Sequence, residues 1–293
     1  MPSLKEVKNR INSIISTQQI TKAMKMVAAS KLRRAQDKIL QMRPFSKKIS
    51  DLLDNTIMAL EGTFESEFAV AREVKTVLMI PITSDRGLCG AFNSNIFRKV
   101  RDMVEGEYSD YYRSGHLIVM PIGKKSYDFY RKRDFKIIDK YWGLFFRLSF
   151  KKVQAAADFV LNGYRKGEFD QVIIIYNEFK NVATQILKTE QFLPIKIETD
   201  RNPSAHKTNY IFEPGLLNVL EQLIPKSLFI RFFKNILESN ASEHGARMTA
   251  MDQATENASE LISTLRLTYN RTRQSAITKE LNEIVGGANA LQE

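Results

Sequence analysis

The sequence predicts an α/β protein with long terminal helices, in which the two ends of the chain pair as an antiparallel two-helix coiled coil around an inserted α/β domain. Two observations predict the helices: residues 1–55 contain no glycine and only two prolines, and no proline follows Pro225. A third predicts the inserted domain, because short apolar runs alternate there with amphipathic stretches, a pattern typical of a mainly parallel, helix-covered sheet. We expect three parts, at residues 1–58, 70–212 and 214–293.

The N-terminal helix begins with a capping signal, since Glu6 follows the expected N-cap Ser3 at the spacing of a capping box. Pro44 lacks a backbone donor, so we expect a bend there. The seam for a partner helix is apolar, then polar, then apolar, at Leu4, Val7, Ile11, Ile14, Gln18, Thr21, Lys25, Ala28, Leu32, Ala35, Ile39 and Met42. Beside its polar part, an offset stripe of Ile20, Met24 and Val27 lies among cations, which predicts a surface that neighbouring proteins contact.

The middle of the chain predicts a Rossmann-like α/β domain. The expected strands are apolar runs at residues 74–83, 116–123 and 170–179. The expected helices are amphipathic stretches at residues 93–106, 124–133 and 148–167. Residues 183–195 and 209–214 are expected to add antiparallel strands, and residues 201–208 to form a loop.

The C-terminal helix is expected to extend for about 68 residues after Pro225, roughly 100 Å. Its seam positions are Met251, Ala254, Ala258, Leu261, Leu265, Thr268, Thr272 and Ser275. A shifted repeat follows at Ile277, Leu281, Ile284, Ala288 and Leu291. Such interrupted heptads favour a two-helix left-handed supercoil over a strict zipper.

If both helices meet the same face of the middle domain at one level, near Asn55 and Leu216, equal rise along them predicts that the numbers of facing residues add up to about 271. Met24 then faces Arg247, Met1 faces Asn270, and the chain after Arg271 has no internal partner. This overhang carries an apolar stripe, which we call the tip, formed by Ile277, Leu281, Ile284, Val285 and Leu291. Because each exposed large apolar side chain costs about 1.5–3 kcal/mol relative to burial, we expect another protein to enclose the tip. The alternative is a tail that folds back onto the middle domain.

The charge distribution predicts an acidic partner. The net charge is +11, and residues 1–50 hold twelve lysines and arginines against two acids. Nucleic acid is a weaker alternative partner, because no aromatic residue for base stacking precedes Phe45. The single cysteine, Cys89, excludes an intrachain disulfide and favours a reducing compartment. No apolar run approaches the roughly 20 residues that span a bilayer.

No motif predicts a catalytic, cofactor or metal site. Phosphate-loop, zinc-protease and nucleophile-elbow patterns are absent, and the three histidines are dispersed. The loop Ser84–Asn93, SDRGLCGAFN, lies between an expected strand and helix, where α/β proteins often bind phosphate. Its GxxG spacing differs from GxGxxG, so a tight turn with Arg86 on the surface is favoured. A nucleotide-dependent α/β enzyme with helical dimerisation arms stays open as the alternative.

Three segments resemble the gamma subunits of F-type ATP synthases: residues 10–36 (RINSIISTQQITKAMKMVAASKLRRAQ), the loop SDRGLCGAFN, and residues 241–291, beginning ASEHGARMTAMDQ. The resemblance implies a central rotor stalk whose coiled coil stands inside a ring of three alpha and three beta subunits. It implies that the α/β domain meets the epsilon subunit and the membrane c-ring. Rotation of the c-ring would then change the conformation of each catalytic beta subunit in turn, with no catalytic site or cofactor on this chain.

The resemblance also implies which residues meet the beta subunits, namely Arg247, Gln274, Thr278 and Met24. Charge complementarity adds a basic N-terminal face, opposite acidic beta-subunit loops, formed by Lys22, Lys25, Lys31, Arg33 and Arg34. Membrane association would be indirect, through the c-ring. The expected location is peripheral, on the cytoplasmic face of a bacterial inner membrane.

Overall fold

The computed structural model describes residues 3–58, 66–69, 72–195, 213 and 215–290. The chain forms two compact units: residues 1–28 with 248–293, here called the helical unit, and residues 29–247, here called the sheet unit. Both units contain parts of the two longest helices, α1 (Leu4–Met58) and α6 (Leu216–Ala290). The predicted long terminal helices are therefore confirmed.

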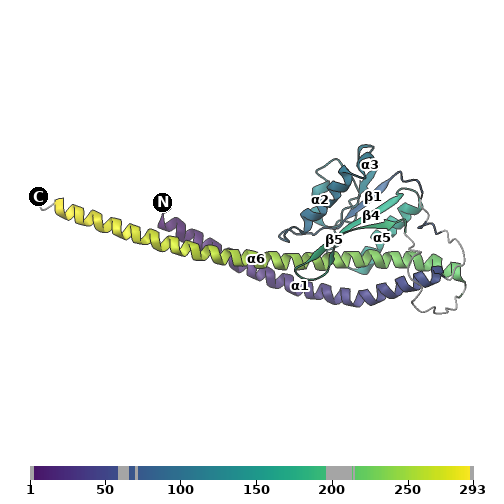
Figure 1. Cartoon of the computed structure of the whole chain (residues 1–293), viewed down its shortest axis with the longest axis horizontal. Coiled ribbons are helices and arrows are strands. Elements are labelled where there is room, and N and C mark those ends of the chain that lie inside the picture. The colour runs from purple at the N-terminus through teal and green to yellow at the C-terminus, as the bar shows by residue number, and fades with distance from the viewer. Residues whose placement is uncertain (1–2, 59–65, 70–71, 196–212, 214, 291–293) are drawn as a thin grey trace. The chain divides into compact units, whose positions relative to one another are not determined.

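The sheet unit contains one five-stranded sheet (Figure 1). Its strands are β1 (Val77–Pro81), β2 (Leu117–Val119), β3 (Lys136–Ile137), β4 (Gln171–Phe179) and β5 (Gln185–Leu193). They lie in the order β3-β2-β1-β4-β5; the first four are mutually parallel, and β5 pairs antiparallel with β4. This arrangement confirms the predicted inserted α/β domain with a mainly parallel sheet.

Helices cover both faces of the sheet because its central strands are apolar on both sides. The shorter helices are α2 (Phe92–Glu105), α3 (Ser109–Arg113), α4 (Lys124–Tyr130) and α5 (Phe150–Arg165). Within β1, Leu78 and Ile80 belong to a core that includes buried residues of α5 and α6. Val77 and Met79 alternate with them and belong to a second core, built mainly with α2. The alternation follows from the two-residue period of a strand.

The expected strands at 74–83, 116–123 and 170–179 and the three expected helices of the middle domain are found, with two additions. The five-residue α3 and the two-residue β3 were not predicted, because segments so short show no measurable periodicity. Residues 183–195 contain the predicted antiparallel strand as β5. The expected loop at 201–208, and the expected strand at 209–214 except for Glu213, lie outside the described residues.

The capping box of α1 is confirmed. The Ser3 amide donates to Glu6 Oε2 over 3.0 Å, and the Glu6 amide donates to Ser3 Oγ over 3.3 Å. Helix α1 continues past Pro44, and α6 is uninterrupted from Leu216 to Ala290. A tail that folds back would need a reversal between Ala246 and Val285, so the uninterrupted helix rules out that alternative.

A buried carboxylate joins three elements of the sheet unit. Glu238 of α6, only 1% exposed, accepts hydrogen bonds from the Arg43 guanidinium of α1 and from the Phe179 amide at the end of β4. Arg43 also donates to the Phe179 carbonyl over 3.3 Å. We call this group the Glu238 clamp. Because its hydrogen bonds are directional, it fixes how α1 and α6 lie against β4.

Candidate functional site: the paired helices and the loop Ser84–Asn93

The N-terminal seam forms as predicted within the helical unit. Every predicted seam position from Leu4 to Ala28 is buried or half-buried, and Val7, Thr21 and Ala28 are the most buried. The polar middle of the seam makes cross-helix polar contacts. Thr21 Oγ1 lies 2.8 Å from Thr255 Oγ1, and Lys25 Nζ lies 2.5 Å from Asp252 Oδ1. These contacts establish that α1 and α6 run antiparallel here.

The predicted offset between the two helices was wrong by about five residues. The predicted pairing placed Thr21 opposite Ala250 and Met24 opposite Arg247, whereas Thr21 meets Thr255. The predicted pairing also fails in the sheet unit, where Arg43 bonds Glu238 rather than lying opposite Leu228. The premise of equal rise along both helices holds, but the assumption that both helices leave the sheet at the same level was wrong. The internal seam therefore extends farther along α6 than predicted, and the unpartnered segment begins after Ala276 rather than after Arg271.

A disulfide test distinguishes the two offsets. We expect the variant with Thr21→Cys and Thr255→Cys to form an intrachain disulfide under mild oxidation, because the two hydroxyls lie 2.8 Å apart. The matched control pairs Ile20→Cys with Thr255→Cys, since the Ile20 side chain is 59% exposed and lies off the seam. Non-reducing electrophoresis measures the product. Equal cross-linking of both pairs, or efficient cross-linking of the pair Met24→Cys with Arg247→Cys, would contradict the observed offset.

The C-terminal seam departs from prediction after Ala258. Met251, Ala254, Ala258, Leu265 and Thr272 are buried or half-buried as expected. Leu261, Thr268 and Ser275 were wrongly placed on the seam and are exposed. The inward positions are instead Ile262, Tyr269 and Ala276, each one residue later. A one-residue shift rotates the seam by about 100°. A search for three- and four-residue spacing does not resolve this shift where it begins, because Leu261 and Ile262 are both apolar.

The tip is exposed throughout its described length. The exposed fractions are 48% for Ile277, 56% for Leu281, 68% for Ile284 and 56% for Val285. Leu291, the fifth predicted member, lies outside the described residues. Every described side chain from residue 277 to 285 is exposed. The predicted apolar stripe is therefore present, and within the helical unit nothing covers its described part.

The surface of residues 20–27 mixes methyl groups and cations, as predicted from its sequence. Ile20 is 59% and Val27 56% exposed, Met24 is half-buried, and Lys22 is exposed. In the sheet unit, the α1 residues Lys31, Arg33 and Arg34 are exposed as well. On α6, Gln274 and Thr278 are exposed, and the Thr278 hydroxyl donates to the Gln274 carbonyl. Lys22, Lys31, Arg33, Arg34, Gln274 and Thr278 are therefore exposed, each on its own unit, while Lys25 is engaged to Asp252.

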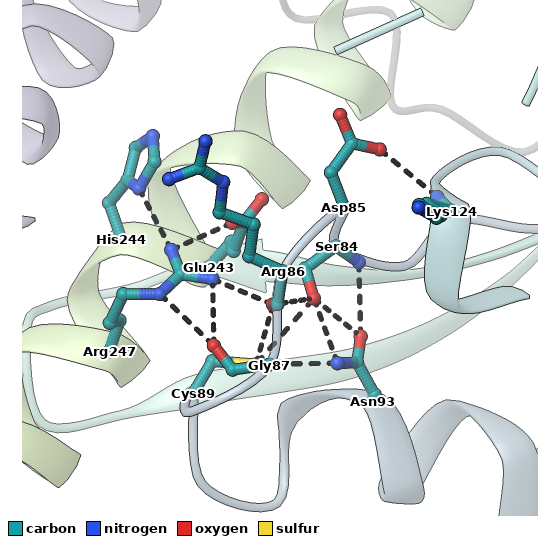
Figure 2. A network of polar contacts seen from close by, with 10 residues as sticks. All are labelled: Ser84, Asp85, Arg86, Gly87, Cys89, Asn93, Lys124, Glu243, His244 and Arg247. Atoms are coloured by element: carbon teal, nitrogen blue, oxygen red, sulfur yellow. Dashed lines mark hydrogen bonds and ion pairs between the residues drawn. The ribbon is translucent and has the colours of Figure 1, made fainter. Parts of the chain in front are cut away.

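Arg247 lies differently, because its guanidinium is engaged inside the sheet unit (Figure 2). Nη1 pairs with Glu243 Oε1 at 2.7 Å, and the two side chains are only 11% and 7% exposed. Nη2 donates to the Arg86 carbonyl over 2.9 Å, and both Nη2 and Nε donate to the Gly87 carbonyl over 3.4 Å. One residue of α6 therefore holds the loop that follows β1.

The same guanidinium sets the protonation of its neighbours. Arg247 Nη1 lies 3.3 Å from His244 Nδ1, and because a guanidinium only donates, this histidine nitrogen accepts and the ring is neutral. Burial, with Arg247 and Lys31 nearby, lowers the pKa of His244 to about 4. Burial raises the pKa of Glu243, although Arg247 and Lys31 oppose that rise. The cluster is thus a charged pair beside a neutral imidazole.

We expect His244 to make the sheet unit less stable in mild acid. An unfolded histidine titrates near pH 6.5 and folded His244 near pH 4, so between these values the unfolded chain binds the extra proton. This contribution to the free energy of unfolding is full above pH 6.5 and is lost as the pH falls towards 4. His244→Gln should remove this part of the pH dependence, whereas His116→Gln, at an exposed position, serves as the control. Denaturant titrations across this range measure it, and identical pH profiles for both variants would refute the assignment.

The loop Ser84–Asn93 is a tight turn held by its own polar groups. Asn93 Oδ1 accepts from the Ser84 amide over 3.0 Å, and Asn93 Nδ2 donates to Cys89 Sγ over 3.3 Å (Figure 2). Arg86 is exposed, as expected of a turn, and burial raises the pKa of Cys89, which disfavours a reactive thiolate. Because the Arg86 and Gly87 carbonyls accept hydrogen bonds from Arg247, the loop connects β1 to α6 structurally. In the described part of the chain, no group of three or more potential ligands could hold a metal ion.

Sequence reasoning missed the partner of Arg247. Glu243 stands four residues before it, a spacing that places both side chains on one helix face, so the signal was present. It was overlooked because such pairs are usually exposed and weak, whereas this one is buried. Asp252, the partner of Lys25, could not be found in the same way, because that pairing depends on the offset between two helices.

Comparison with known proteins identifies the class. The model of the ATP synthase family matches residues 3–291. A gamma chain from Cytophaga hutchinsonii is 54% identical over 99% of both chains, and one from Chlorobium phaeobacteroides is 48% identical over 100% of this chain and 99% of the relative. The central stalk and c-ring structure of the Tetrahymena thermophila mitochondrial ATP synthase matches at 27% identity and a TM-score of 0.56, over 80% of this chain and 99% of the other.

A Euglena gracilis mitochondrial ATP synthase structure matches with a TM-score of 0.65 and 24% identity, over 98% of this chain and 94% of the other, which establishes the fold. The fold is that of ATP synthase central stalks. The chain belongs to the ATP synthase gamma-chain family and is a central-stalk subunit of an F-type ATP synthase. Among the described residues, no helix combines the length and apolar content that crossing a bilayer requires.

Proposed function

We propose that this chain couples rotation of a membrane c-ring to sequential conformational changes in three catalytic beta subunits, without a catalytic site or cofactor of its own. The observation that carries the proposal is the exposed tip on α6, since its apolar side chains require a surrounding protein. A ring of three alpha and three beta subunits would surround the tip in this way. An asymmetric helix pair inside that ring contacts each beta subunit differently and so favours a different nucleotide-binding state in each.

The contacts with the beta subunits are the most detailed part of the proposal. Exposed Gln274 and Thr278, four residues apart on α6, offer polar groups just outside the seam. On α1, the proposed contacts are Met24 and Lys25. Farther along the same helix, Lys31, Arg33 and Arg34 complement acidic loops of the beta subunits. Arg247, only 11% exposed, would reach a beta-subunit carboxylate by exchanging one of its carbonyl acceptors. Such an exchange is favourable because hydrogen bonds between charged groups are the stronger ones.

The solved relatives support a c-ring as a further partner. The Tetrahymena and Euglena structures contain a c-ring, and the Euglena structure also contains F1. We assign the sheet unit to contacts with a c-ring, as these relatives suggest, and with an epsilon subunit. We further propose that the chain lies peripherally on the cytoplasmic face of a bacterial inner membrane. Attachment to the membrane is then indirect, through the c-ring.

Co-expression with alpha and beta subunits tests this function. We expect a complex with three copies of each and one copy of this chain, and we expect it to hydrolyse ATP while this chain alone does not. Single-molecule observation of a bead attached to the sheet unit should show rotation during hydrolysis. Recovery of the chain as a free monomer from cells that contain both partners would overturn the proposal.

A further inference from the structure

A groove on the sheet unit, between α2, α3 and α4, is lined by none of the contact residues named above. Figure 1 marks α2 and α3. Its volume is about 730 Å³, within the usual range of small-molecule sites. Apolar and aromatic side chains line it, including Val100, Val104, Tyr130 and Phe135. The groove therefore offers a partly apolar surface to a ligand.

The groove is also strongly basic. Four arginines line it, against one acid, Glu105. Arg101 is paired with Asp102 and lies 3.9 Å from Glu105, and the Arg133 guanidinium lies 3.5 Å from the centre of the Phe129 ring. The other two arginines, Arg98 and Arg113, are exposed and make no ion pair or side-chain hydrogen bond with any residue in the described part of the chain. Two cations beside an apolar surface thus lack an anion.

A buried polar atom in the groove wall also lacks a partner. Tyr130 is 1% exposed, and its hydroxyl has no hydrogen-bond partner among the described residues. Arg133 and Tyr130 both line the groove. Buried polar atoms without partners are uncommon in folded proteins and call for an explanation. A ligand that brings a hydrogen-bond acceptor supplies one.

We propose that this groove binds a small amphipathic anion, a molecule that carries one carboxylate, sulfonate or phosphate group on an apolar or aromatic body. The anionic group pairs with Arg98 and Arg113, whose guanidinium groups suit planar and tetrahedral oxyanions. The apolar body lies against Val104 and Phe135, and an oxygen of the ligand accepts a hydrogen bond from Tyr130. The inference is independent of the rotor function, because it concerns only residues 94–135 of the sheet unit.

Fluorescence titration of the full chain with anilinonaphthalene sulfonate tests the groove. We expect saturable binding that Arg98→Ala combined with Arg113→Ala weakens about tenfold or more. The matched control is Lys99→Ala, an exposed cation next to Arg98 on α2 that does not line the groove, and its Kd should be unchanged. Equal Kd values for the double variant and the original chain would overturn the proposal.

Two further measurements identify the chemistry. Dodecanoate should displace the probe from the groove and dodecanol should not, and equal displacement by both would refute an anion site. Tyr130→Phe should weaken probe binding several-fold while raising the melting temperature of the free chain, because it removes the unpartnered hydroxyl. Unchanged probe affinity in this variant would remove Tyr130 from the site. Loss of the probe site in the assembled complex would show that a subunit covers the groove and would overturn a small-molecule role.

Discussion

Replacing Arg247 by alanine should lower the free energy of unfolding of the sheet unit by about 3–5 kcal/mol at pH 7, the usual cost of leaving one partner of a buried ion pair alone. Glu243, with 7% of its side chain exposed, would keep its position without its cation. The Arg86 and Gly87 carbonyls would also lose their donor. Denaturant unfolding of the full chain, followed by a probe in the sheet unit, measures the change.

The stability lost in the Arg247→Ala variant should be larger at pH 7 than at pH 5. Burial raises the pKa of Glu243, and removing Arg247 takes away the main influence that opposes that rise. A carboxyl group with a raised folded pKa binds its proton more tightly when folded, so stability falls as the pH rises through that range. The variant should therefore be closer to the original chain at pH 5 than at pH 7.

Two controls accompany the Arg247 experiment. Lys25→Ala breaks an exposed pair, with side chains 39% and 56% exposed, and should cost no more than about 1 kcal/mol. Combining Glu243→Gln with Arg247→Met removes both charges and should recover much of the lost stability. A loss below about 1 kcal/mol for Arg247→Ala would contradict the buried-pair interpretation.

Ending the chain after Ala276 should prevent stable assembly with alpha and beta subunits while leaving the isolated chain almost unchanged. Ala276 is the last half-buried position of the seam, and every described side chain from residue 277 to 285 is exposed. Removing this segment should cost the free chain little, since its described side chains, at residues 277 to 285, pack against nothing in the helical unit. In the complex it removes several large apolar side chains, each contributing about 1.5–3 kcal/mol on burial.

Point variants separate loss of the apolar stripe from loss of the segment itself. Leu281→Gln should weaken assembly by roughly ten- to a hundredfold, which corresponds to burial of one large side chain. Lys279→Gln, at an exposed position two residues away, is the matched control and should assemble normally. Co-purification and ATPase activity of the complex are the measurements. Normal assembly of the truncated chain would refute enclosure of the tip.

Periodicity predicted the elements of this fold well because the forces behind it are local. The α1 seam from Leu4 to Ala28 lies inward as expected, and the alternation of Leu78 and Ile80 with Val77 and Met79 matches two covered faces. The fold class needed only these patterns and the distribution of proline and glycine.

What the sequence left undetermined depends on pairing between distant segments. The offset that sets Thr21 against Thr255 is a relation between α1 and α6, which neither helix encodes alone. After Ala258 the seam shifts by one residue, so that Ile262 is buried and Leu261 is exposed, although both are apolar. The groove at Arg98 and Arg113 brings together residues of two helices, and neither helix alone indicates an anion site.

The two buried carboxylates of α6 have a mechanical consequence. Glu238 is held to the end of β4, and Glu243, through Arg247, is held to the loop after β1, so α6 is fixed at two points five residues apart. Apolar contacts alone resist separation but allow sliding, because they have no preferred direction. Two directional attachments instead prevent α6 from spinning about its own axis against the sheet. A twist applied to the sheet unit is thus transmitted to its segment of α6, because these two attachments resist rotation of the helix relative to the sheet.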